Sequence, residues 1–378
     1  MQNNILHIFS NIIFSKGYCC TIIIDTQHKK THSVPNSFTD FVNETENCSL
    51  EDIYQKFPHN KEIVDEYFDF ITQNSIGVFL TKLEIENFAK MSHDYFSPYH
   101  FENAIVDVRN YSSNTEKIIS KIDELNVGYI QVRFLEHCAQ ADLKKCLSLI
   151  NHLSFEFCSF VLPYNPSLLS VGEDGVSTEE FANYPKLDSI TIYNHPDDKI
   201  EHDYLKTIIY TSLKDIRKTG CGAVQKEYFS VDTKHILQSI HFNTCLYKKI
   251  YVSESGIIKN CPYSMLEYGN FLDLSNSEVL KITKNKKFTH LWHIKKDEIE
   301  VCKDCEFRLV CTDCRCFIKA PQNIHSQPSK CFYNPYIARW KGEEGYVSVE
   351  DCGSYSKESG FIPNHKKIAE INKQLWES

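Results

Sequence analysis

Cysteine is the residue type with the clearest chemical potential in this chain, because sixteen are present among 378 residues. Two residues between cysteines allow both thiolates to reach one metal ion from a single tight turn. A cysteine that returns after five more residues supplies a third ligand, and one distant cysteine can close the site. Five cysteines fall within fifteen residues: Cys302, Cys305, Cys311, Cys314 and Cys316. This spacing predicts a metal centre made of thiolate ligands.

A second pair of cysteines flanks a predicted β-hairpin. Cys245 and Cys261 stand on either side of two short β-rich runs, Lys249–Val252 and 257–258. Gly256 lies between these runs and suits a tight turn, because glycine adopts backbone conformations that other residues avoid. The hairpin would bring Cys245 and Cys261 close together in space.

Spacing alone does not decide which metal these thiolates bind. Four cysteines in paired turns bind zinc tetrahedrally as readily as they bind an iron–sulfur cluster. The apolar start of the chain, at 5–14, has no basic flank and no small-residue cleavage site, so a secretory leader is not expected. We therefore expect a cytoplasmic protein with reduced thiols, which argues against a disulfide framework.

The cysteine pattern from Cys245 to Cys331 resembles the SPASM domain, the auxiliary-cluster module of peptide-modifying radical S-adenosylmethionine enzymes. The shared features are a cysteine, a turn glycine and a second cysteine, followed by a CxxC pair and a cysteine after five more residues. In detail the chain resembles the grasp-with-spasm peptide maturases, which occur beside an ATP-grasp ligase and a ribosomally made precursor peptide. Four segments carry this likeness: NTC at 243–245, KNCP at 259–262, CKDCEFR at 302–308 and CFYNPY at 331–336.

The resemblance implies two [4Fe-4S] clusters when it is carried over position by position. One cluster would be held by Cys302, Cys305, Cys311 and Cys331. The other would be held by Cys245, Cys261 and Cys314. The family has a further cysteine just before the hairpin, which this chain lacks. We assign Cys221 as the fourth ligand, because its flanking glycines allow close backbone approach, and an open coordination site is the alternative. Cys316 competes with Cys314, since the spacing after Cys311 is one residue shorter than the family's commonest spacing.

The loop that starts radical chemistry in such enzymes is missing. It has the pattern CxxxCxxC and follows the first strand of the barrel. The corresponding strand here is 104–108, and the segment after it, 109–114, contains no cysteine. Bound S-adenosylmethionine is therefore not expected. The resemblance implies a degenerate radical-SAM-like partial barrel that lacks the catalytic cluster.

The first 95 residues are predicted to form a small α+β, winged-helix-like module. Strands are expected at 5–14, 18–25, 31–34 and 76–80, with Ser15 to Gly17 as the first hairpin loop. Ser49 is a plausible N-cap for a helix at 50–57, and Asn60 for the next helix. This order of elements resembles a RiPP recognition element, which binds a leader peptide at a strand edge. A plain winged-helix or capping domain is the alternative.

The middle of the chain, 100–240, alternates strands and helices. Strands are predicted at 104–108, 129–135, 155–162 and 189–193, with helices at 118–125 and 141–149. Ser177 and Glu180 have the spacing of a capping box. Strands separated by helices favour parallel pairing and hence an α/β fold. The SPASM domain is assigned to 241–340, and a C-terminal extension to 341–378 ends in a predicted helix at 366–376.

Charge and hydropathy exclude several classes of function. The net charge of −9 argues against general binding of nucleic acid, and no apolar run approaches the roughly 18 residues of a membrane span. The charged stretch 295–300 is expected to be a solvated surface.

Together with the resemblance, these features predict an iron–sulfur protein that binds or presents a ribosomal precursor peptide alongside an ATP-grasp ligase. Two alternatives remain open. One is a zinc-binding adaptor without catalysis, and the other is an oxidoreductase whose auxiliary cluster acts on the peptide.

Overall fold

The computed structural model describes residues 4–165, 181–203, 206–217, 221–356 and 360–376. The chain divides into two compact units, each of which is built from separate segments. The first unit comprises Met1–Tyr95, Val224–Thr244 and Ile294–Ser378, and the second comprises Phe96–Ala223 and Cys245–His293. The segment 241–340 thus contributes to both units. The predicted capping box of Ser177 and Glu180 lies outside the described residues.

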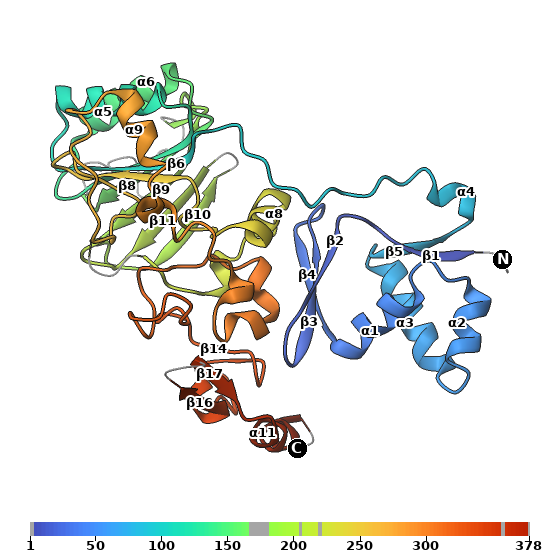
Figure 1. Ribbon diagram of the computed structural model, residues 1–378. Coiled ribbons are helices and arrows are strands. Elements are labelled where there is room, and N and C mark those ends of the chain that lie inside the picture. Colours follow the sequence, from blue (N-terminus) through green and yellow to red (C-terminus); the bar gives the residue numbers. More distant parts are fainter. Residues whose placement is uncertain (1–3, 166–180, 204–205, 218–220, 357–359, 377–378) are drawn as a thin grey trace. The chain divides into compact units, whose positions relative to one another are not determined.

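The second unit is built on one eight-stranded, mostly parallel sheet (Figure 1). The strand order is β10-β11-β9-β8-β7-β6-β12-β13, and only the outermost pair at each end is antiparallel. The strands are β6 (Phe101–Val108), β7 (Val127–Phe134), β8 (Phe157–Pro163), β9 (Leu187–Tyr193), β10 (Lys199–Asp203), β11 (Lys206–Thr211), β12 (Lys249–Val252) and β13 (Ile258–Lys259). The predicted mixed α/β character with parallel pairing is confirmed.

Helices cover one face of this sheet because alternate strand residues are apolar. Ala104, Val106 and Val108 of β6 are buried, at no more than 3% exposure, and point to the same face. Figure 1 shows α5, α6 and α9 together along one side of the sheet. Among the described residues, the helices of this unit are α5 (Ser113–Asp123), α6 (Gln140–His152), α9 (Asn276–Ile282) and α10 (Lys286–Thr289). The predicted β12–β13 hairpin is confirmed, with Gly256 at φ +82° in its turn.

Two features of the sheet escaped the sequence analysis. Strands β10 and β11 were not predicted. β10 has a single isoleucine among polar and charged residues, whereas β11 has a short apolar run that was left unassigned. β12 was predicted only as half of a hairpin, yet it also pairs in parallel with β6, where Ile250 lies opposite Ala104. A partner about 145 positions away cannot be recognised from local periodicity.

A buried ion pair joins neighbouring strands near their carboxyl ends. The Arg133 guanidinium on β7 donates to both carboxylate oxygens of Asp107 on β6, at 2.6 and 2.8 Å. Tyr251 on β12 donates its hydroxyl to the same carboxylate at 2.8 Å. Burial raises the pKa of Tyr251, and the neighbouring Asp107 raises it further. Three strands are thus tied by one bidentate contact and one hydrogen bond.

The first unit contains an N-terminal module of two small sheets and four helices. β2 (Ile12–Lys16), β3 (Cys20–Asp25) and β4 (Lys30–Pro35) form an antiparallel sheet, and β1 (Ile5–Ile8) pairs with β5 (Gly77–Leu80). The helices are α1 (Asn36–Thr45), α2 (Leu50–Lys56), α3 (Lys61–Gln73) and α4 (Lys82–Ile85). The Ser49 side chain caps α2 as predicted, by accepting from the Asp52 N–H. Asn60 stands at the N-cap of α3 but makes no capping hydrogen bond.

The predicted single strand at 5–14 is wrong. The chain leaves the β1–β5 sheet after Ile8, turns through 9–11 and enters the other sheet at Ile12. Ser10 and Asn11, which interrupt the apolar run, are polar turn formers, and this explains the break. No definite range was predicted for helix α1 from the sequence. Its N-cap position is Pro35, which offers no side-chain capping group to mark the start of the helix.

The C-terminal part of the first unit is mostly irregular. Its regular elements are α8 (Thr233–His241), β14 (Tyr333–Asn334), β15 (Arg339–Trp340), β16 (Gly353–Ser356), β17 (Gly360–Pro363) and α11 (His365–Trp376). It packs on the N-terminal module through an apolar cluster in which Ile22 and Ile24 of β3 meet Ile236 and Val310. Among the described residues, none of the helices has the length and apolar character needed to cross a membrane.

Replacing Asp107 by alanine tests the buried ion pair. The Arg133 charge would then be buried without a partner, so we expect a loss of about 3–5 kcal/mol in the free energy of unfolding of the second unit. The matched change Tyr251→Phe removes one hydrogen bond and is expected to cost about 1 kcal/mol. Urea unfolding, with hydrogen exchange of β6 and β7 to assign the transition, measures both. Equal losses in the two variants would contradict this account.

Candidate metal centre

Four of the predicted ligands line one cavity in the first unit. Cys302, Cys305, Cys311 and Cys331 contribute to its wall, together with Lys296 and a group of apolar and aromatic side chains. The cavity has a volume of about 30 Å³. That is room for about two water molecules. Residues that are 29 positions apart in the sequence therefore meet around a single small space.

Short 3-10 turns place the first three of these thiols. Cys302–Asp304 forms one turn and Glu306–Leu309 the next, so Cys305 lies at their junction. The Cys305 N–H donates to the Cys302 carbonyl at 3.0 Å, and the Cys311 N–H donates to the Phe307 carbonyl at the same distance. Val301 enters the first turn at φ +68°, a strained conformation for a β-branched residue.

Cys331 reaches the cavity from a separate segment. It forms an isolated parallel bridge with Val224, and its N–H donates to the Pro328 carbonyl at 3.3 Å. Two residues later the chain enters β14 at Tyr333, whose ring also lines the cavity. The backbone on both sides of Cys331 is thus held in place.

A buried lysine stands beside these thiols. Lys296 is 6% exposed, and its Nζ donates to the Cys311 carbonyl at 2.7 Å. Burial alone would lower the pKa of this ammonium, but the nearby Cys311, Asp313 and Cys302 raise it. The predicted solvated stretch at 295–300 is therefore wrong for Lys296. A fixed positive charge at this position favours thiolate over thiol in its neighbours.

Burial acts on the thiols in the opposite direction. It raises the pKa of Cys302, Cys305 and Cys331, so these side chains carry their protons when no metal is bound. None of the sixteen cysteines, all of which are described, forms a disulfide. In the described part of the chain, no three His, Cys, Asp or Glu side chains are arranged to hold a metal ion together.

The residues at the cavity fit an iron–sulfur cluster in identity and in their shared position. Four thiols and one compensating cation are a suitable donor set, since clusters are held by cysteine thiolates. The small volume means that the thiol side chains would have to move apart to receive such a group. Zinc requires less displacement, because a single ion replaces a cluster of several atoms.

Three predicted ligands of the other cluster interact electrostatically with Lys249 in the second unit. Lys249 Nζ donates to Cys245 Sγ at 3.5 Å. The pKa of the Lys249 ammonium is raised. Burial alone would lower it, but the nearby Cys245, Cys261 and Cys221 outweigh that effect. Burial raises the pKa of Tyr263 to about 12, and Cys221 and Cys261 add to this shift. Cys221 therefore lies in the electrostatic neighbourhood of the hairpin cysteines.

Cys314 and Cys316 belong to the first unit, and the choice between them stays a prediction. Cys314 is buried and Cys316 is partly exposed. The loop that carries both is fixed by Asp313, which pairs with the Arg315 guanidinium at 2.6 Å and accepts from the Asn243 amide at 2.6 Å. Both members of the ion pair are at most 2% exposed.

Sequence reasoning missed the groups that surround the thiols. Lys296 and Lys249 were not singled out, because no recognised motif places a lysine at these distances from cysteines in the sequence. Glu306 and Tyr333 lie within the segments 302–308 and 331–336 that carry the family resemblance, so their position beside cysteines was the available signal.

Replacing Asp313 by alanine is expected to destabilise the cysteine loop strongly. Arg315 would keep a buried, unpaired charge, which costs about 3–5 kcal/mol. The control is Asp297→Ala, because Asp297 makes a similar contact with Arg308 at 3.0 Å but is half exposed. Exposed pairs contribute about 0–1 kcal/mol. Thermal unfolding compares the two variants, and a control as damaging as Asp313→Ala would refute the assignment.

Comparison with known proteins identifies a distant structural likeness and no sequence family. No family model and no curated protein matches the sequence. The structure is similar to crystal structures of Streptococcus suis SuiB, alone, bound to the precursor peptide SuiA and bound to S-adenosylmethionine. The TM-score is 0.30 with 9–10% sequence identity, and the match covers 82% of this chain and 96% of the SuiB chain.

Proposed function

We propose that this chain is an iron–sulfur SPASM protein that takes part in the maturation of a ribosomally synthesised peptide, alongside an ATP-grasp ligase. One observation carries the proposal: the four cysteines assigned to one cluster from the sequence, Cys302, Cys305, Cys311 and Cys331, line the same cavity. The second set, Cys221, Cys245 and Cys261, shares one lysine as its electrostatic neighbour. Cys314 is proposed as its remaining ligand.

The site favours a role in binding or presenting the peptide. When bound, a four-iron cluster supplies a rigid covalent link between chain segments and a one-electron redox couple. The irregular segment from Cys302 to Cys331 has few regular elements, so such a link would stabilise it considerably. The parallel sheet, which we regard as a degenerate radical-SAM-like partial barrel, has no cysteine between β6 and α5. The initiating site of radical chemistry is therefore not part of the proposal.

The N-terminal module is proposed to hold the leader part of the precursor. Among the residues that the structure describes, β4 pairs only with β3, so one of its edges presents backbone donors and acceptors that an added strand can use. α3 packs beside it, since the His32 ring of β4 meets the Phe70 ring of α3 at 5.8 Å. A strand edge next to a helix gives a peptide both hydrogen bonds and a side-chain groove.

A zinc-binding adaptor is the second candidate function. The cavity volume of about 30 Å³ favours it, because one ion needs less space than a cluster. In that case the same thiolates would hold zinc tetrahedrally and stabilise the fold without redox chemistry. The two candidates differ in metal identity and in colour.

Metal analysis of anaerobically purified protein tests the proposal. We expect about eight irons per chain with matching sulfide and brown visible absorption, since two four-iron clusters are assigned. One or two zinc ions in a colourless protein would replace the proposal by the zinc adaptor. Protein without any bound metal would overturn both.

Cysteine variants then test the ligand assignment. Alanine at Cys302, Cys305, Cys311 or Cys331 is expected to remove about four irons and leave the other cluster in place. The control is Cys48→Ala, because Cys48 is partly exposed at the start of α2 and belongs to neither set. Iron loss in Cys314→Ala but not in Cys316→Ala supports Cys314, and the reverse supports Cys316. Unchanged iron in all four cavity variants would refute the site.

A further inference from the structure

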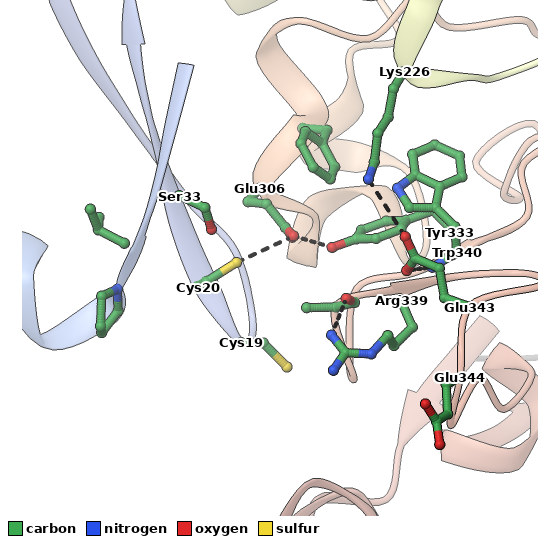
Figure 2. A pocket seen from close by; sticks show the side chains of 14 residues that line it. Cys19, Cys20, Ser33, Lys226, Glu306, Tyr333, Arg339, Trp340, Glu343 and Glu344 are labelled. Atoms are coloured by element: carbon green, nitrogen blue, oxygen red, sulfur yellow. Dashed lines mark hydrogen bonds and ion pairs between the residues drawn. The ribbon is translucent and has the colours of Figure 1, made fainter. Parts of the chain in front are cut away.

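Figure 2 shows a large pocket in the first unit. This pocket shares part of its wall with the sulfur-lined cavity. Its volume is about 840 Å³, which lies in the range of small-molecule sites. One wall is formed by Cys19 and Cys20 and the end of β4, and the other by residues of β14, β15 and the segment after them. Tyr333, Phe307 and Trp340 line both the pocket and the cavity.

Aromatic rings form one wall of this pocket. Tyr333 and Trp340 are directly opposite each other in the β14–β15 pair, and their ring centroids are 4.9 Å apart. Phe307 packs edge-on against Tyr333 at 5.1 Å. Cross-strand and edge-on aromatic contacts hold such rings rigidly. The indole Nε1–H of Trp340 is buried and has no hydrogen-bond partner among the described residues.

A carboxylate is held beside the indole ring. Glu343 Oε2 accepts from the backbone N–H of Trp340 at 2.7 Å, and the Glu343 backbone N–H donates to the Trp340 carbonyl at 3.0 Å. Gly342 between them adopts φ +99°, which favours glycine in this turn. The acidic group is therefore positioned by the backbone before any ligand arrives.

Lys226 already places an ammonium group against both features. Its Nζ lies 5.7 Å from the centroid of the Trp340 ring and 3.6 Å from Glu343 Oε1 (Figure 2). An aromatic face and a carboxylate together are the usual environment of a bound cation. The Lys226 and Glu343 side chains are 54% and 43% exposed. Exposed pairs of this kind are weak, so a competing cation can displace Lys226.

The charges around the pocket favour a positive ligand once Lys226 has moved. Glu343 and Glu344 line it, and Arg339 is the basic lining residue that then remains. Glu306 also lines the pocket, but burial raises the pKa of its carboxyl group, so it adds little to this charge. Arg339 donates to the Ala338 carbonyl at 3.2 Å, so part of its guanidinium is already engaged. The net charge of −9 of the whole chain adds a general attraction for cations.

We propose that this pocket binds a lysine or arginine side chain of a peptide, and that Lys226 occupies the position of that side chain in the free protein. The ligand cation lies over Trp340 and pairs with Glu343, while the peptide backbone passes along the pocket. That the natural ligand is the precursor peptide rests on the proposed function. Recognition of a basic side chain is independent of it.

Calorimetric titration with short capped peptides tests the site. The probe is a glycine–serine peptide with one central lysine, and the matched probes carry glutamine or glutamate instead. We expect the lysine peptide to bind about tenfold more tightly than the glutamine peptide. Glu343→Gln is expected to remove most of this preference. Glu66→Gln, on the exposed surface of α3, is the control and should leave it unchanged.

Lys226→Met gives the sharpest result, because a residue that occupies the site should improve binding when it is removed. We expect the lysine peptide to bind about fivefold more tightly to this variant, since an exposed ion pair no longer has to be broken. Lys366→Met, on the exposed face of α11, is the matched control. Equal affinity for the lysine and glutamine peptides, or weaker binding to Lys226→Met, would overturn the proposal.

The metal content of the same samples separates this test from that of the proposed function. Lysine-selective binding by protein without iron would support the pocket and contradict the iron–sulfur assignment. Iron-loaded protein without lysine selectivity would support the iron–sulfur assignment and contradict the proposed pocket.

Discussion

The close approach between Gly17 and Glu306 is the contact on which the cysteine cavity depends. A Cβ atom on Gly17 would lie 2.6 Å from the Glu306 backbone nitrogen, so only glycine fits there. Around it, the Tyr18 N–H donates to the Asp304 carbonyl at 2.8 Å, and the Arg308 guanidinium donates to the Lys16 carbonyl at 2.7 Å. The β2–β3 hairpin thus holds the turns that carry Cys302 and Cys305. An irregular segment receives its fixed geometry from a regular sheet.

Each unit places a lysine amine beside a group of thiols. Lys296 stands next to Cys311 and Cys302 in one unit, and Lys249 next to Cys245 in the other. Each thiol that binds a metal must lose a proton, and a neighbouring positive charge reduces the cost of the resulting thiolate. Two units with different folds therefore use the same electrostatic arrangement of a lysine beside cysteines. The lysines also make direct contact with the cysteine residues, so they help to orient these segments.

Residue patterns within short stretches of sequence predicted the elements that depend mainly on neighbouring residues. Strands β6 to β9 follow from their apolar runs, and the cap at Ser49 follows from one side-chain oxygen and a nearby backbone N–H. The pairing of β12 with β6 and the packing of residues 302–311 on β3 depend on contacts between remote segments. For the site, spacing identified the thiols of the cavity. It did not identify Lys296, whose burial arises only after the chain ends have packed together.

The division of the first unit among three stretches of the chain has a consequence for biosynthesis. Ile22 and Ile24 are synthesised early, but the cluster that buries them includes Val310 near the other end. This face of β3 therefore remains uncovered while nearly three hundred residues are added. Contacts of such long sequence separation form slowly and leave apolar surface open to aggregation. We infer that the second unit can reach its fold during translation, whereas the first unit is completed only after its final segment has left the ribosome.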